Sequence, residues 1–102
     1  MSDVLPGADL VEKGVADLAN GRLTVEALLV AIGAERLRGL GVPVVARENL
    51  PTEPEHRLYA KILEENPRDA HSQYNAVVRR LVSFEHALEQ RLGRQRRRAP
   101  VA

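Results

Sequence analysis

The stretch HSQYNAVVRRLVSFEHALEQRL, residues 71–92, decides the fold of this chain. Together with Ala70, its apolar side chains recur at steps that alternate between four and three residues, a spacing that keeps one edge of a helix facing a partner helix. Pro67 suits the first position of a helix and Gly93 suits its end, so we expect one helix from about Pro67 to Leu92, roughly 40 Å long. We call its apolar edge the seam; the members are Ala70, Tyr74, Val77, Leu81, Phe84 and Leu88.

Three shorter helices are expected before the long one. Apolar residues at helical spacing predict a first helix that ends at Asn20, and a second helix with Thr24 as its N-cap and Gly33 as a kink. A capping-box pattern in residues 52–55 starts a third helix, which stops near residues 64–65. The pattern predicts an all-α, four-helix bundle-like domain with a long C-terminal helix.

The first of these helices contains one glycine with a structural implication. Gly14 lies in mid-helix, where it costs about 1 kcal/mol relative to Ala, so we expect a neighbouring backbone to approach there. On the same helix, the spacing predicts that Asp17 faces away from the apolar side, toward solvent.

Composition narrows the class of protein. The chain of 102 residues is 44% hydrophobic and 28% charged, which is typical of one globular domain. Aromatic residues make up 3%, which argues against a stacking platform for single-stranded nucleic acid. The absence of cysteine excludes disulfides, thiolate metal sites and cysteine nucleophiles. We see neither a secretory signal pattern nor an apolar run of the roughly 18 residues that span a bilayer, and we expect a cytoplasmic protein.

The charges are distributed unevenly along the chain. Residues 1–66 contain seven Lys plus Arg against eleven Asp plus Glu, whereas residues 67–102 contain eight against three, so the two parts carry −4 and +5. We expect a helical domain over residues 1–93 and a basic, disordered tail over residues 94–102. Such a cluster can contact an acidic protein or a nucleic acid, through Arg94, Arg96, Arg97 and Arg98.

The length of the last helix predicts self-association. The three other helices are expected to be half to two-thirds as long, too short to cover the seam from end to end. Each seam side chain left wet would forgo roughly 1.5 to 3 kcal/mol of burial, and a second copy is the simplest cover. We therefore expect a homodimer through the seam, and a small, non-catalytic interaction or assembly protein without a cofactor.

The side of the long helix away from the seam is polar. His71, Asn75, Arg79 and His86 fall within an arc of about 80°, centred roughly 140° from the seam. Arg79 and His86, with six residues between them, resemble the R-x4-6-H element of the HEPN family, small all-α proteins that include dimeric, metal-independent ribonucleases. The resemblance implies proton transfer by His86 and phosphate stabilisation by Arg79. Phosphodiester cleavage is thus the enzymatic alternative, although a shared cleft should border the seam.

Two further patterns carry weaker hypotheses. Residues 24–43 are a faint helix-turn-helix with its break at Gly33, which makes a DNA-binding regulator the second alternative. The three histidines lack the spacing of a zinc pair on a helix. Glu85 and Glu89 accompany His86 on the same turn or the next, which makes a divalent-metal site an alternative there, but we expect no metal.

Overall fold

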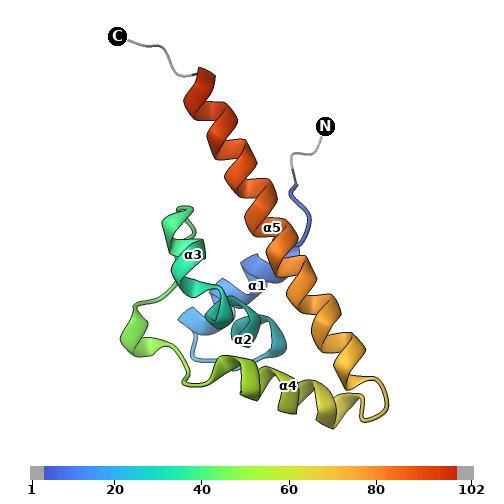
Figure 1. Ribbon diagram of the computed structural model, residues 1–102. Coiled ribbons are helices and arrows are strands. Elements are labelled where there is room, and N and C mark those ends of the chain that lie inside the picture. Colours follow the sequence, from blue (N-terminus) through green and yellow to red (C-terminus); the bar gives the residue numbers. More distant parts are fainter. Residues whose placement is uncertain (1–3, 99–102) are drawn as a thin grey trace.

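The fold is all-α, as predicted from the sequence. The computed structural model describes residues 4–98, and within that range it contains helices and no strand. There are five α-helices in this range rather than the four expected, and the last is by far the longest (Figure 1). In chain order the elements are α1 (Ala8–Ala19), α2 (Val25–Ile32), α3 (Ala34–Gly39), the 3-10 turn η1 (Arg47–Asn49), α4 (Pro54–Glu65) and α5 (Ala70–Arg98).

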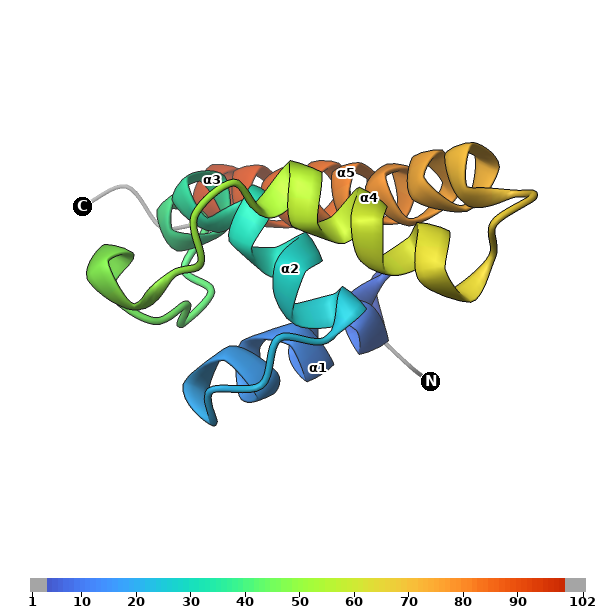
Figure 2. The same cartoon turned by 90° about the horizontal axis from the view of Figure 1, so that it is seen from below.

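α2 lies at the centre of the molecule. Figure 2 shows it between α1 on one side and the α4–α5 pair on the other, and it contacts all three helices. Its sequence is apolar nearly all round, which suits a helix that is covered on every side. The largest fully buried side chains come from four elements and meet around α2: Val11, Leu29, Val30, Leu37 and Leu58.

The second expected helix is two helices, because Gly33 is a break rather than a kink. The predicted N-cap is confirmed, since Thr24 Oγ1 accepts a hydrogen bond of 3.1 Å from the Ala27 N–H. Gly33 ends α2 and begins α3, and the side chain of Glu85 packs on it. A Cβ at this position would lie 2.7 Å from Glu85 Oε2, so a larger residue requires the Glu85 carboxylate to shift.

α1 and α2 pack at very short range. The close approach predicted at Gly14 is confirmed, because a Cβ there would overlap the carbonyl oxygen of Glu26 and the side chain of Val30. A larger residue would push the two helices apart, which explains why a residue with low helix propensity stands in the middle of α1.

The prediction that Asp17 faces solvent is wrong. Asp17 is buried, and its Oδ2 accepts hydrogen bonds of 2.6 Å from Lys13 Nζ and 2.6 Å from Thr24 Oγ1, with Arg22 Nε 3.4 Å from its Oδ1. The hydrogen bond from Lys13, and then that from Thr24, lowers the pKa of Asp17 below its ordinary value. Two of these partners come from the loop that turns back from α1 to α2, so helical periodicity within α1 could not reveal them.

The capping box predicted for α4 is also wrong. The helix starts at Pro54, and the preceding residue is Glu53, with φ 48° and no side-chain cap hydrogen bond. Proline at the first helical position fixes its own φ and excludes its predecessor from the right-handed helical region. Pro54 therefore sets the start of α4, and Thr52 stays exposed.

α5 differs from its predicted bounds at both ends. Residues 67–69 form a turn, and the Asp69 carbonyl accepts the N–H of Gln73 at 3.0 Å, so the helix starts at Ala70. The predicted stop at Gly93 is wrong, because a glycine closes a helix in the left-handed region and Gly93 is not among the positive-φ residues. α5 continues into the segment expected as a tail and is roughly 43 Å long. Residues 99–102 of that segment lie outside the described part.

The helix is long enough to reach across a bilayer but not apolar enough. Among residues 4–98, no helix combines the length and the hydropathy of a membrane span.

Candidate functional site

The seam is covered by the chain's own helices. Tyr74 packs against Tyr59 of α4, with 5.5 Å between the ring centroids and 56° between the planes. Farther along α5, Leu81 lies against Gly33 at the end of α2, and the Cβ of Phe84 lies against Gly7 at the start of α1. Ala70, Leu81 and Phe84 are buried, and Tyr74, Val77 and Leu88 are partly buried against the same core.

The premise that the shorter helices leave the seam bare is therefore wrong. α4 covers the first turns of α5, and α2 and α1 cover its middle. The three shorter helices thus pack one after another along the length of α5. Within one chain the seam is part of the core. A homodimer interface formed by the seam stays a prediction.

An apolar groove begins where the seam ends. Two adjoining depressions of about 380 and 440 Å³ lie between α1, α5 and the turn after α3, and they share Glu12, Phe84 and Leu88. We call them together the α1–α5 groove. Its apolar lining comes from three parts of the chain: Val4, Leu5, Ala8, Val11 and Val15; Leu40, Val42 and Pro43; Phe84 and Leu88.

The chemistry of this groove suits binding more than catalysis. Its walls are aliphatic, and among the described residues that line it Glu12 and Arg91 are the charged ones. A concave, mostly apolar surface with few polar groups takes up an apolar side chain or ridge. The groove could not be predicted from the sequence, because the residues that line it lie far apart along the chain.

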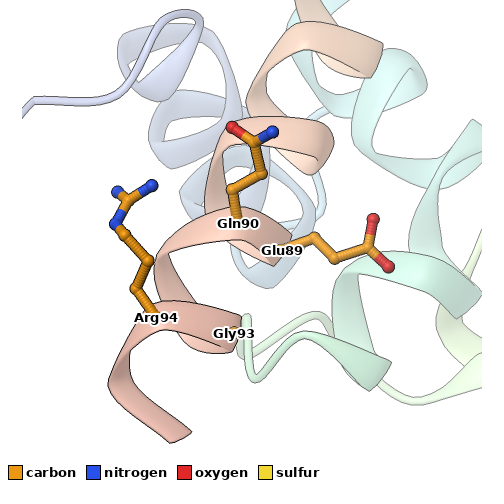
Figure 3. Close-up of a pocket in the computed structure, with 4 residues that line it drawn as sticks. All are labelled: Glu89, Gln90, Gly93 and Arg94. Carbon is orange, nitrogen blue, oxygen red and sulfur yellow. The ribbon is translucent and has the colours of Figure 1, made fainter. Parts of the chain in front are cut away.

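The basic C-terminal segment is carried on a helix. Arg94 is exposed on α5, and residues 96–98 continue the same helix, although their side chains lie outside the described part. Glu89 Oε1 lies 2.9 Å from Arg36 Nη2 of α3. Figure 3 shows Glu89 and Arg94 pointing to different sides of α5, around a depression that Gln90 and Gly93 also line. The Glu89 side chain thus faces Arg36 of α3, and Arg94 points to another side of α5.

The predicted polar face lies on the open side of α5. Asn75 Nδ2 and His71 Nε2 are 3.2 Å apart, one turn from each other. Arg79 and His86 are both exposed, and a step of seven residues places them about 10 Å apart along the helix axis. A phosphate held there by one chain would stay in high-dielectric water, where electrostatic stabilisation is weak. The ribonuclease alternative therefore requires a second protein surface that shields the phosphate from water, and it stays a prediction.

The segment expected as a helix-turn-helix has its side chains engaged with the protein itself. Within residues 24–43, α3 has six residues, and it would be the recognition helix. Arg36 is bonded to Glu89 of α5, and Arg38 donates to the carbonyl oxygen of Val45. A recognition helix must offer such donors to DNA, so this geometry does not favour the DNA-binding alternative.

Glu85 is a buried carboxylate whose environment the sequence did not reveal. Its side chain packs over Gly33, and its Oε1 lies 3.9 Å from Arg36 Nη1. Burial raises the pKa of Glu85 above its ordinary value, and the charge of Arg36 opposes that change. The available signal was its position, four residues after Leu81 and beside the seam, which places it on the packed side of α5.

Neither a metal site nor a relative points to a function. Within residues 4–98 there is no group of three or more His, Asp or Glu side chains that could hold a metal ion. Comparison with protein-family models, with curated proteins and with solved structures finds no match for this chain. The surfaces of the molecule are therefore the basis for inferring its function.

Proposed function

We propose that this chain is a small, non-catalytic helical protein that acts as a homodimer and binds an acidic partner through the basic end of α5. The observation that carries the proposal is the continuation of α5 through Gly93 to Arg98. It places the arginines on a helix that extends beyond α1 and α2 (Figure 1).

The charge pattern of this helix end favours an acidic partner. Residues 91–98 contain five arginines and no acidic residue, and the last acidic residue before them, Glu89, is bonded to Arg36. Arg94, Arg97 and Arg98 occupy positions i, i+3 and i+4 of α5, so they share one side of the helix. Like charges at this spacing repel one another, and an acidic surface relieves the repulsion while gaining charge-assisted hydrogen bonds.

The test compares two triple variants with the same net charge. Replacing Arg94, Arg97 and Arg98 by Gln lowers the formal net charge from +1 to −2, and so does replacing Arg57, Arg68 and Arg79. We expect the first triple to elute from a polyanion column at clearly lower salt than the second. With double-stranded DNA as the polyanion, the slope of log K against log salt should fall by about 0.9 for each phosphate that the protein no longer neutralises. Equal elution of the two triples would refute the proposal, because net charge alone would then explain binding.

A further inference from the structure

We propose that the α1–α5 groove receives a second copy of this chain, and that its occupant is the Leu88–Leu92 side of the partner's α5. The inference rests on the proposed homodimer and names the surface that forms it. The predicted interface, the seam, is thereby shifted toward the C-terminal end of α5, where the chain's own helices cover Leu88 and Leu92 only in part.

The proposed occupant is a short apolar ridge, formed by Leu88 and Leu92, where α5 leaves the helical core. Leu88 is the last residue of α5 that packs against the core, and Leu92, one turn later, does not belong to that cluster. At 100° per residue, Arg94 and Arg97 stand about 160° and 140° around the helix from Leu92. Arg96 stands about 40° from Leu92, so the apolar ridge ends at Leu92, and this ridge can face a second copy while Arg94 and Arg97 on the opposite side face an acidic partner.

Groove and ridge are continuous within one chain. Leu88 and Phe84 line the groove, and Leu92 follows directly on the same helix. A patch that contains both a hollow and a projection is self-complementary under a two-fold axis, because each copy fills the groove of the other at the same time. The exposed apolar side chains elsewhere on the body, Leu23, Leu63 and Val82, lie outside the groove lining.

Charge complementarity selects a second copy and its orientation. Glu12 of α1 lines the groove, whereas Asp9 is paired with Arg80 of α5 and Asp17 is buried against Lys13 and Arg22. Residues 88–98 carry five arginines and Glu89, a formal charge of +4. An antiparallel crossing lays the basic end of one α5 beside Glu12 in the groove of the other copy, whereas a parallel pair would bring the two basic ends together.

The first experiment measures mass by sedimentation equilibrium between about 1 and 100 µM, a range that brackets micromolar dissociation constants. We expect a mass of twice 11.3 kDa for the unaltered chain. Leu92→Gln should weaken the dimer about a hundredfold, because a two-fold interface loses two leucines at once. Leu63→Gln and Val82→Gln are matched controls, since both side chains are exposed on the body, and they should leave the mass unchanged.

The second experiment traps the proposed contact with a disulfide and does not require a variant that weakens the dimer. The chain has no cysteine, so chains with Leu92→Cys and chains with Val42→Cys can be mixed and oxidised without competition from native thiols. We expect a disulfide between the two different chains, because such a bond forms only where the Cα atoms approach to within about 7 Å. A mixture of Leu63→Cys and Val42→Cys chains should stay uncrosslinked.

The outcomes distinguish the groove assignment from the proposed function. A monomer at 100 µM would refute both the groove assignment and the proposed homodimer. A dimer that survives Leu92→Gln, or a Leu92–Val42 mixture that does not crosslink, would refute the groove assignment and leave the homodimer standing. In either case, polyanion retention of Leu92→Gln reports separately on the basic end, because its arginines are unchanged.

Discussion

The two halves of α5 differ in how they are stabilised, although they form one continuous helix. The first half, up to Leu88, contributes Ala70, Leu81 and Phe84 to the core and is flanked by α4, α2 and α1. The second half, residues 89–98, contributes nothing to the core cluster and is linked to the body through Glu89 and Arg36. Helices shorter than about 12 to 15 residues are marginal in water without packing. The first half is therefore stable through burial, whereas the second half depends on its continuity with the first half.

The largest effect on the free energy of unfolding is expected from a core residue of α4, the helix that covers the first half of α5. Leu58 of α4 is fully buried, whereas Leu63 on the same helix is 43% exposed. Leu58→Ala should lower the free energy of unfolding by about 2 to 5 kcal/mol, through lost burial and the cavity left behind. Leu63→Ala should cost less than about 1 kcal/mol. Urea unfolding measures both, and equal costs would show that α4 does not bury one face against α5.

An intermediate effect is expected from Gly93 in the second half. Gly93 lies inside α5 and lines a depression on its surface. Gly93→Ala should stabilise the end of the helix by about 1 kcal/mol, because alanine has the higher helix propensity. Slower amide hydrogen exchange over residues 89–98, with unchanged global stability, would show that this half opens on its own. Gly33→Ala is the contrasting variant, and it should destabilise, because its Cβ would meet Glu85.

The smallest effect on the free energy of unfolding is expected from Glu85, near the border between the two halves of α5. Burial raises the pKa of Glu85 in the folded state, so the folded protein binds more protons than the unfolded chain just above the ordinary value of 4.5. Stability contributed by Glu85 is therefore fully present below pH 4.5 and is lost as the pH rises through the folded-state pKa. Glu85→Gln should remove this loss and be slightly more stable than the unaltered chain at pH 7.

The control for this last prediction is Glu89→Gln. Glu89 contacts the same Arg36 but is exposed, so its replacement should change the free energy of unfolding at pH 7 by less than about 1 kcal/mol. Urea unfolding at pH 4 and pH 7 distinguishes the two. If Glu85→Gln were the less stable protein at pH 7, the attraction of Arg36 would outweigh desolvation at this carboxylate.

Several local features were predictable because their cause lies within a few residues. The Thr24 cap and the close approach at Gly14 each follow from the conformational properties of one residue type. The capping box at residues 52–55 failed for a local reason as well, because Pro54 competes with Thr52 for the start of α4. Where two local signals coincide, periodicity does not show which one prevails.

The candidate site was predictable only in its parts. The seam residues, the arginines of the C-terminal segment and the polar face of α5 were all recognised from spacing and charge. The α1–α5 groove was not, because α1, the turn after α3 and α5 reach it from distant parts of the chain. Asp17 and Glu85 were misjudged for the same reason, since their neighbours Thr24 and Gly33 belong to other elements.

The sequence by itself determined that this protein is helical, that its last helix is the longest, and which side of that helix is apolar. These properties follow from side-chain periodicity and backbone preference, which act over one or two turns. Only the tertiary structure decided that the seam is covered within one chain, and that an apolar groove opens at Leu88. Burial depends on which helices cross and how closely they approach, and such proximity between distant segments leaves no periodic trace in the sequence.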